Sequence, residues 1–320
     1  MSEIDLSVIL ITASTYERIR KTVKRLASQD NADRIQLVIV HQAENPPEVI
    51  AEDLRTLGEV TMFPTGTFES TGDPRADAVS VATGPVTVFA EDHCFPEPGW
   101  AAALVRAHSA GHGAVGPTMR NANPNTLLSW VDMSLNFGPS VQRDASEESS
   151  LLCWHNTSYS TELLLEQEDL GTLLEAEGVL YRRLEEAGRS LYRESDAKVS
   201  HTNISGLRGF MLGQFWGTRL FWATLTSVEG WTWPRRLLFA LASPVVGGRR
   251  FLRALQDLNR TYPGHTVAAL PYMVLGTSLL TCCIVAGLLA CSGDCMKYRL
   301  SLVFERERYL AAGEEQIIFA

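Results

Sequence analysis

Short apolar runs alternate with amphipathic stretches over the first third of the chain. Residues 6–12 form the first apolar run, and Ile19, Val23 and Leu26 then recur at helical spacing among basic side chains. Further apolar runs occupy residues 35–40, 60–63 and 85–90. Runs of this length are typical of buried strands, and the stretches between them leave room for helices. The pattern predicts an α/β fold with a mostly parallel, doubly wound sheet.

The pattern is less regular in the middle of the chain. We expect a further strand at residues 151–154, acidic and leucine-rich helices over roughly 161–188, and a short strand at 197–200 directly before His201. These elements extend the sheet domain to residue 203.

The composition changes after His201. Acidic residues become scarce, while phenylalanine, tryptophan and arginine accumulate between Arg208 and Arg260. Aromatic side chains mixed with arginines suit a membrane interface. No Asp, Glu, Lys or Arg lies between Arg260 and Asp294, and residues 267–291 are mostly apolar. This stretch is long enough to span a bilayer, and a helix buried in a soluble core is the alternative.

The expected domains follow from this change. Residues 1–203 form the sheet domain, 204–263 an aromatic and arginine-rich juxtamembrane region, 264–293 a transmembrane or membrane-embedded helix, and 294–320 a tail. Arginines before the apolar stretch outnumber the basic residues after it, which places the sheet domain on the cytoplasmic side. We therefore expect the protein at the cytoplasmic face of a membrane, the bacterial inner membrane.

Composition and charge exclude several classes of protein. The chain has 320 residues, 45% of them hydrophobic, and a formal net charge of −9, which argues against nucleic acid as a partner. The six cysteines form no CxxC pair or zinc-type spacing and no evident disulfide framework, as in a reduced compartment. The first residues lack a basic region followed by a long apolar one, so we expect no signal peptide.

The candidate chemistry lies where the fourth apolar run stops, at Glu91-Asp92-His93. Ligands of open α/β sheets gather at the carboxyl ends of such strands. Two carboxylates and an imidazole in three residues can hold a divalent cation, which in turn can hold a diphosphate. The alternative is a surface turn with solvated acids.

Ordered motifs around this triplet resemble those of the family 2 inverting GT-A glycosyltransferases over roughly residues 6–203. The first strand ends in Thr12-Ala13-Ser14-Thr15-Tyr16-Glu17-Arg18, which resembles the family's Pro-Thr-Tyr-Asn-Arg loop. The resemblance implies that Thr12, Ser14 and Tyr16 meet the nucleotide. The second strand ends in His41-Gln42-Ala43-Glu44-Asn45, where Gln42 takes the position of the base-binding loop without the family's Asp pair and Gly-Ser.

The same resemblance assigns the diphosphate and metal site. Gly72-Asp73-Pro74-Arg75-Ala76 is similar to the family's Ala-Arg-Asn element, and Arg75 would pair with phosphate oxygens. Glu91-Asp92-His93 falls on the family's Asp-x-Asp, so that Glu91 and Asp92 bind the metal diphosphate and Asp92, His93 and His201 ligate the metal. Imidazole in place of the last Asp favours Mn²⁺ over Mg²⁺.

An acid near residue 177 completes the implied reaction. Counting back from Arg183-Leu184 puts Glu177 on the family's catalytic base, and a solvated helix acid is the alternative. The resemblance thus implies transfer of a sugar from a nucleotide-diphospho-sugar to a glycan or lipid-linked acceptor, in assembly of a cell-envelope polysaccharide near a membrane surface. A second hypothesis is a catalytically degenerate GT-A fold that serves as a membrane-associated binding or assembly module. A nucleotidyltransferase or dinucleotide oxidoreductase is disfavoured because no Gly-rich phosphate loop follows the first strand.

Overall fold

The computed structural model describes residues 3–13, 15–153 and 156–319. The chain divides into two compact units. The first unit comprises Met1–Arg120, Gln142–Thr202 and Gln316–Ala320, and the second comprises Asn121–Val141 and Asn203–Glu315. Residues 121–141, expected in the N-terminal domain, therefore group with the C-terminal helices.

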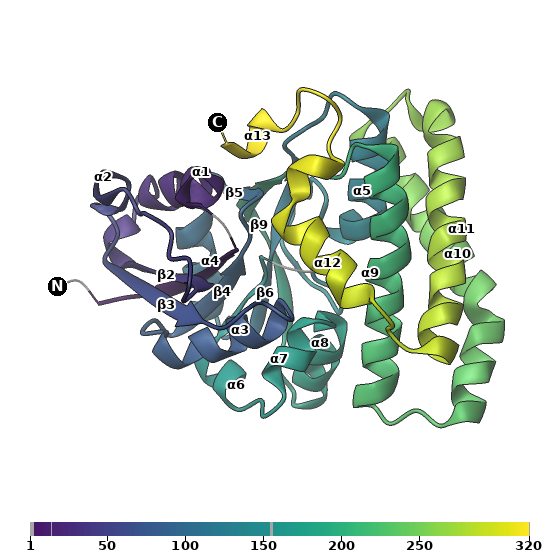
Figure 1. Ribbon diagram of the computed structural model, residues 1–320, viewed down its shortest axis with the longest axis horizontal. Coiled ribbons are helices and arrows are strands. Elements are labelled where there is room, and N and C mark those ends of the chain that lie inside the picture. Colours follow the sequence, from purple (N-terminus) through teal and green to yellow (C-terminus); the bar gives the residue numbers. More distant parts are fainter. Residues whose placement is uncertain (1–2, 14, 154–155, 320) are drawn as a thin grey trace. The chain divides into compact units, whose positions relative to one another are not determined.

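The first unit is built on a nine-stranded sheet (Figure 1). Its strands are β1 (Leu6–Thr12), β2 (Ile35–Gln42), β3 (Glu59–Thr65), β4 (Val86–Ala90), β5 (Cys94–Pro96), β6 (Ala114–Asn121), β7 (Glu147–Glu148), β8 (Ser158–Ser160) and β9 (Leu191–His201). The spatial order is β3-β2-β1-β4-β8-β6-β9-β5, with β7 paired to β9. Strands β3, β2, β1 and β4 run parallel, as expected. The pairs β4–β8, β6–β8, β5–β9 and β7–β9 are antiparallel.

The parallel strands are apolar because helices cover both faces of the sheet. All seven residues of β1 are buried, and the first seven of β2. The register sets Thr12 beside His41 and Leu10 beside Ala90, so β1, β2 and β4 end along one edge. Since these three strands run in the same direction, the side chains that follow them gather at that edge.

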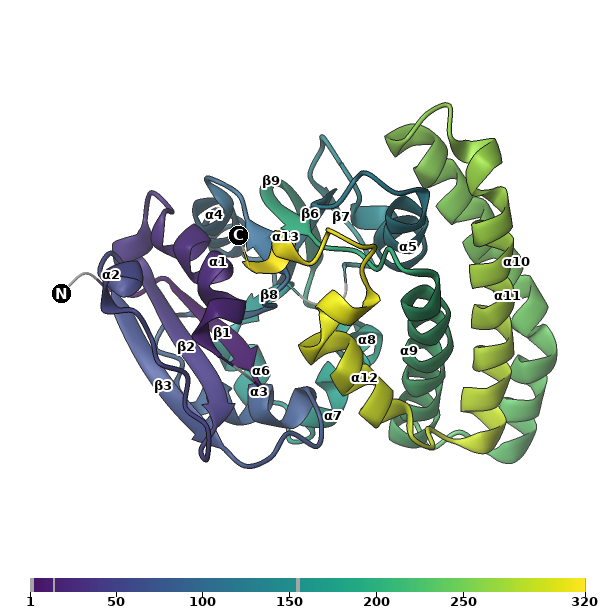
Figure 2. The same cartoon turned by 45° about the horizontal axis from the view of Figure 1, so that its top comes forward.

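The helices of this unit are short. They are α1 (Tyr16–Ala27), α2 (Ala51–Leu54), α3 (Gly72–Ala78), α4 (Trp100–Ser109), α6 (Thr161–Leu165), α7 (Leu170–Leu174), α8 (Glu177–Glu186) and α13 (Gln316–Phe319), with 3-10 turns η1 (Ala32–Arg34) and η2 (Val79–Val81). Helices α1 and α3 lie on opposite faces of the parallel strands (Figure 2), as right-handed crossovers in opposite directions require. Lys21 on α1 donates to the carbonyl of Ile317, which ties α13 to this unit.

The strand expected at residues 151–154 is wrong for 151–153, which are not in a strand, and Trp154 lies outside the described residues. Oγ1 of Thr157 donates a hydrogen bond to the carbonyl of Cys153, and the Tyr181 hydroxyl lies 2.9 Å from the same oxygen, so side chains rather than a neighbouring strand satisfy it. The strand in this region is β8, where Ser158 and Tyr159 pair with β4 and β6. Strand β9 is longer than the expected 197–200.

The second unit is helical. It contains α5 (Leu127–Phe137), α9 (Leu207–Val228), α10 (Trp233–Thr261), α11 (Thr266–Ala290) and α12 (Cys295–Phe304), with 3-10 turns η3 (Gly138–Ser140) and η4 (Arg306–Tyr309). Glycines let α11 approach its neighbours closely. A Cβ at Gly276 would stand 2.6 Å from Phe210, and one at Gly287 would stand 2.6 Å from the carbonyl oxygen of Arg219.

Helix α11 is the apolar segment identified in the sequence. Among the described residues it is the one helix long and apolar enough to cross a membrane, and 44% of its most apolar window is buried inside the protein. Partial burial of this kind also occurs in core helices of soluble proteins, so membrane crossing stays a prediction.

Candidate functional site

The carboxyl end of β4 and the end of β9 meet at one point of the first unit. Glu91, Asp92 and His93 follow β4 directly, and all three are buried. Strands β5 and β9 pair with Cys94 opposite His201, and the Thr202 amide donates to the carbonyl of His93. This pairing places His201 beside His93, although the two residues are 108 positions apart in the chain.

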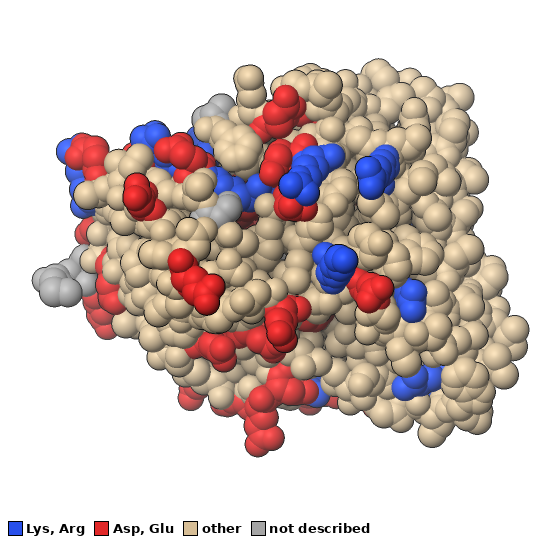
Figure 3. All heavy atoms as spheres, in the orientation of Figure 1, with Lys and Arg blue, Asp and Glu red and all other residues tan. Residues whose placement is uncertain are grey.

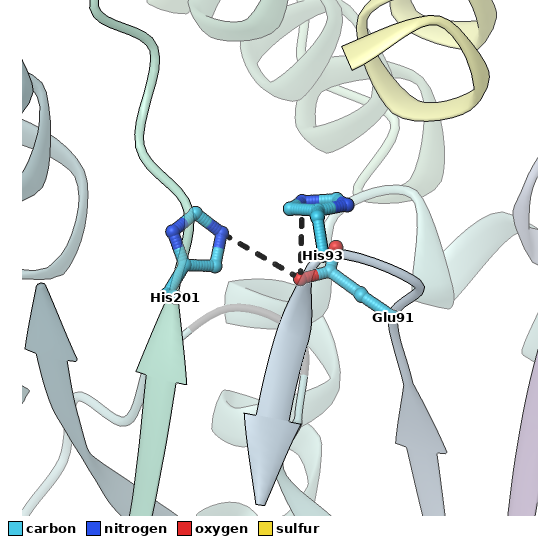
Figure 4. A group of neighbouring side chains, drawn as sticks. All are labelled: Glu91, His93 and His201. Carbon is cyan, nitrogen blue, oxygen red and sulfur yellow. Dashed lines mark ion pairs between the residues drawn. The ribbon is translucent and has the colours of Figure 1, made fainter. Parts of the chain in front are cut away.

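Three side chains here form a potential metal site. Glu91 Oε2 lies 3.7 Å from His93 Nε2 and 3.8 Å from His201 Nε2, and both rings point at this oxygen (Figure 4). One ligand atom from each side chain falls within 4.8 Å of the others. Ligand atoms about 2.1 Å from a shared ion are separated by distances of this order. Two imidazoles and one carboxylate suit a transition-metal ion, so the residues present fit such a group.

Asp92 takes a different position from its neighbours. Its Oδ2 is paired with Nε of Arg18, and its Oδ1 lies 2.6 Å from Nδ1 of His93. All three side chains are buried. With Nδ1 engaged by a carboxylate, Nε2 of His93 faces Glu91, and this is how metal-binding histidines are commonly oriented. Asp92 was expected as a metal ligand, but its carboxylate is turned to Arg18 and His93 and is not in the group of three.

Asn156 supports Glu91, the carboxylate of the group of three. Its amide nitrogen Nδ2 lies 3.2 Å from Glu91 Oε2, and its backbone amide donates to the carbonyl of Phe89 on β4. Asn156 has a φ of 55°, a left-handed conformation that asparagine tolerates better than most residues. The side chain of Asn156, itself anchored to β4, therefore helps to hold the carboxylate of Glu91 in place.

Arg75 is buried in α3 with little to satisfy it. Its residue exposure is 1%, and its Nε and Nη2 atoms have no hydrogen-bond partner among the described residues. A buried guanidinium in this state is costly unless a ligand pairs with it. The start of α3 is fixed by Glu175, whose Oε1 accepts from the amides of Thr71 and Gly72. Arg75 therefore comes from an element separate from those that carry the group of three.

Glu177 is buried at the first turn of α8. Its Oε2 accepts from the hydroxyls of Tyr181, at 2.8 Å, and Tyr159, at 3.1 Å. Burial first, and the charge of Glu177 second, raise the pKa of both tyrosines well above its ordinary value, so both remain donors. The hydroxyl of Tyr181 also lies 3.2 Å from Oγ1 of Thr157, the residue after Asn156. A path of contacts therefore runs from Glu177 to the vicinity of Glu91.

The expected nucleotide contacts are distributed along the same edge of the sheet. Thr12 is buried at the end of β1, and Gln42 is half-buried at the end of β2. Tyr16 begins α1, and its hydroxyl lies 3.4 Å from Asp53 Oδ2. Burial, with the charge of Asp53, raises the pKa of this phenol. Ser14 lies outside the described residues.

Three residues to which the sequence assigned no role are part of the site. Arg18 and Asn156 contact the acidic triplet directly, and Tyr181 binds Glu177. The sequence did contain a signal for Arg18. It is next to the apolar position Ile19 and four residues before Thr22, so helical spacing places it on the buried face of α1. Thr22 faces the same point, with its hydroxyl 3.3 Å from the carbonyl of Glu91.

Comparison with known proteins identifies the fold and the family. The chain is similar to the structure of the mannosyltransferase PcManGT from Pyrobaculum calidifontis in complex with GDP-Man and Mn²⁺, with a TM-score of 0.54, 14% identity, and coverage of 92% of this chain and 88% of that one. It is also similar to residues 1–349 of S. aureus TarS in complex with UDP, with a TM-score of 0.47, 17% identity, and coverage of 89% and 90%. No curated protein sequence matches the chain.

The shared fold agrees with the GT-A architecture expected from the motifs. A family model described as glycosyl transferase family 2 matches residues 7–166, half of the chain, and this range includes all but the first residue of β1, strands β2 to β8 and the Glu91-Asp92-His93 triplet. The chain therefore belongs to glycosyl transferase family 2.

Proposed function

We propose that the chain is an inverting, metal-dependent glycosyltransferase that moves a sugar from a nucleotide-diphospho-sugar to an acceptor hydroxyl. The observation that carries the proposal is the convergence of Glu91, His93 and His201 within 4.8 Å at the end of β4. Family membership supports the reaction class. The convergence supports a metal-bound diphosphate at this point.

A divalent cation held by Glu91, His93 and His201 would neutralise charge on the leaving diphosphate. The donor set favours Mn²⁺ over Mg²⁺, because Mg²⁺ prefers oxygen ligands and imidazole suits transition ions. The Mn²⁺ in the mannosyltransferase complex is consistent with this choice. Asp92, between Arg18 and His93, would keep the imidazole in its ligating orientation.

Arg75 is proposed to bind the donor phosphates. Two of its guanidinium nitrogens have no partner among the described residues, and a planar guanidinium can donate to two phosphate oxygens at once. Thr12, Ser14, Tyr16 and Gln42 are proposed to face the nucleotide, since three of them belong to the edge where β1 and β2 end.

Glu177 is the proposed base. As the acceptor oxygen forms its bond to the anomeric carbon, the bond from that carbon to the diphosphate breaks, and the acceptor proton passes to the carboxylate. The contacts from Glu177 through Tyr181 and Thr157 toward Asn156 support its membership of this site. Two phenol donors hold its carboxylate in one orientation.

The proposed acceptor is a glycan or lipid-linked saccharide at the cytoplasmic face of a bacterial inner membrane, as in assembly of a cell-envelope polysaccharide. Support comes from the second unit, in which the apolar helix α11 follows an arginine-containing helix α10. Comparing a lipid-linked acceptor with its water-soluble head group in a transfer assay tests this part of the proposal.

The reaction is tested by incubating the full chain and Mn²⁺ with a panel of UDP-, GDP- and dTDP-sugars, and measuring nucleoside diphosphate release with and without acceptor mixtures. Release from one donor, abolished by Glu91→Ala and by chelation, is the expected result. Tight binding of a nucleotide sugar without release or transfer would contradict the proposal and favour the degenerate binding module. Leu165→Glu, a change at an exposed position of α6, is the matched control.

A further inference from the structure

Helix α10 has two opposite faces. Its buried face within the second unit includes Ala240, Ser243, Gly247, Ala254 and Leu258. The opposite face exposes large apolar side chains at spacings of one to seven residues, namely Leu237, Leu238, Leu241, Val245 and Leu252. Of these, Leu241 is 73% exposed. Because these positions follow the helical repeat, they form one apolar stripe rather than scattered exposed residues.

Helix α11 extends this apolar surface. Val267 is 79% exposed, and Val274, two turns further along, is also exposed. Between the two helices lies an apolar groove of about 510 Å³, lined by Phe251 and Pro244 from α10 and by Val274 and Cys282 from α11, among others. The stripe and the groove are both within the second unit. A surface of this kind in a water-soluble protein marks a place of interaction.

The charged side chains around this surface are mostly basic. Residues 231–293 contain six arginines, no lysine, no glutamate and one aspartate, in a chain of formal charge −9. The aspartate, Asp257, is buried and lies 3.2 Å from Arg260. Arg249 and Arg253 are exposed beside the apolar stripe. The occupant that complements this surface is both apolar and anionic.

These features agree with a lipid surface. In Figure 3 the region of α11 is almost free of charged side chains. Exposed apolar residues, arginines and Trp233 at the start of α10 are the features of helices that lie in the headgroup region. Arg249, Arg250 and Arg253 lie in the middle of α10, so this helix does not suit a crossing of the hydrocarbon core.

We propose that the outer face of α10 and α11 docks on an anionic bilayer, with both helices in one leaflet at the headgroup boundary. The apolar stripe enters the acyl region, the groove between the helices receives lipid chains, and Arg249 and Arg253 contact lipid phosphates. The proposal does not depend on the transferase reaction, and its test uses no substrate.

Flotation of the full chain with vesicles tests the docking. Binding to phosphatidylcholine vesicles that contain phosphatidylglycerol, weak binding to phosphatidylcholine alone, and release by salt are expected. The double variant Leu241→Glu/Val245→Glu should lose binding. Arg249→Glu/Arg253→Glu should weaken it at least about tenfold, whereas Arg249→Lys/Arg253→Lys should keep most of it.

Leu165→Glu, which changes an equally exposed leucine of the first unit, should bind as the unaltered chain does. Thermal melts of each variant establish that it is folded. Salt-resistant binding to neutral vesicles, or solubility of the chain only in detergent, would overturn surface docking and favour a spanning helix. Absence of vesicle binding together with a dimer that Leu241→Glu/Val245→Glu converts to monomers would assign the face to a second copy of the chain instead.

Discussion

Nδ1 of His93 lies 2.6 Å from Oδ1 of Asp92, the residue directly before it in the chain. The other carboxylate oxygen of Asp92 is paired with Arg18, so one buried carboxylate joins helix α1 to the imidazole. This arrangement fixes the ring with Nε2 toward Glu91. Asp92 therefore orients a proposed metal ligand, and its own carboxylate faces Arg18 and His93.

The first prediction concerns this positioning. Asp92→Asn should lower the affinity for Mn²⁺ roughly 10- to 100-fold, because removal of the carboxylate behind a ligating histidine has effects of this size. Isothermal titration of Mn²⁺ in the presence of a nucleoside diphosphate measures it. Asp169→Asn, which changes an acid paired with Arg183, is the control and should leave the affinity unchanged.

The same substitution has a consequence for stability. Arg18 would lose the negative charge of a buried partner, at a cost on the order of 3 kcal/mol. Arg18→Met added to Asp92→Asn should recover much of this stability in urea unfolding, while the Mn²⁺ affinity stays low. Recovery of both quantities together would show that Asp92 acts only through folding.

The second prediction concerns Arg75. Arg75→Met should fold at least as stably as the unaltered chain, because it removes a buried charge with two unpartnered nitrogens. The same variant should bind nucleoside diphosphate at least about tenfold more weakly, since charge-assisted bonds to phosphate are lost. Unfolding curves and nucleotide titrations measure the two effects. Arg75→Lys should bind with intermediate affinity, and equal binding by all three would remove Arg75 from the site.

The third prediction separates two roles of Glu177. As a base, Glu177→Gln should lower kcat roughly 10²- to 10⁴-fold without changing Mn²⁺ affinity. Tyr181→Phe, which removes one donor to the carboxylate, should lower stability by about 1 kcal/mol and kcat much less. Steady-state kinetics and thermal melts measure both variants. A Glu177→Gln protein with full kcat and a lowered Tm would assign this acid to a structural role.

The fourth prediction concerns pH. Burial lowers the pKa of His108 on α4 to about 4, below its ordinary 6.5. Its ring nitrogens bond the carbonyl of His112 and the hydroxyl of Ser158. The unfolded chain takes up a proton below pH 6.5 and the folded chain does not, so the stability due to neutral His108 is present above pH 6.5 and is lost as the pH falls toward 4.

Urea unfolding between pH 7 and pH 4 measures this loss, on the order of 2 kcal/mol for this partly buried group. His108→Gln should be less stable at pH 7 and should show a shallower decline on acidification. His265→Gln, at an exposed position, should follow the unaltered chain. If the stability of all three proteins declined in parallel, protonation of His108 would not be the cause of the loss of stability at low pH.

The parallel half of the sheet could be predicted because its strands are continuous apolar runs, and the motif order indicated the GT-A fold and the family. The lack of a strand at residues 151–153 could not be predicted, because the apolar side chains there are typical of a strand. In the structure the Thr157 hydroxyl satisfies the carbonyl of Cys153, and the Tyr181 hydroxyl contacts the same oxygen. The contact with Tyr181 joins residues that are distant in sequence. The grouping of residues 121–141 with the C-terminal helices depends on tertiary packing in the same way.

For the site, the sequence indicated the acidic triplet and His201 but not the direction of each side chain. Asp92 and Glu91 are adjacent, and the contacts of Asp92 with Arg18 on α1 and with His93 turn its carboxylate away from the group of three. The left-handed backbone of Asn156, which brings its amide to Glu91, has no sequence signature beyond the residue type.

The proposed function depends most on whether Glu91, His93 and His201 form one metal site. The most direct measurement is Mn²⁺ electron paramagnetic resonance of the full chain with a nucleoside diphosphate, for the unaltered protein and for Glu91→Ala, His93→Ala and His201→Ala. We expect one bound Mn²⁺ per chain, lost or strongly weakened in each variant and unchanged in Leu165→Glu. Unaltered Mn²⁺ binding in the three folded variants would contradict a metal site at these residues.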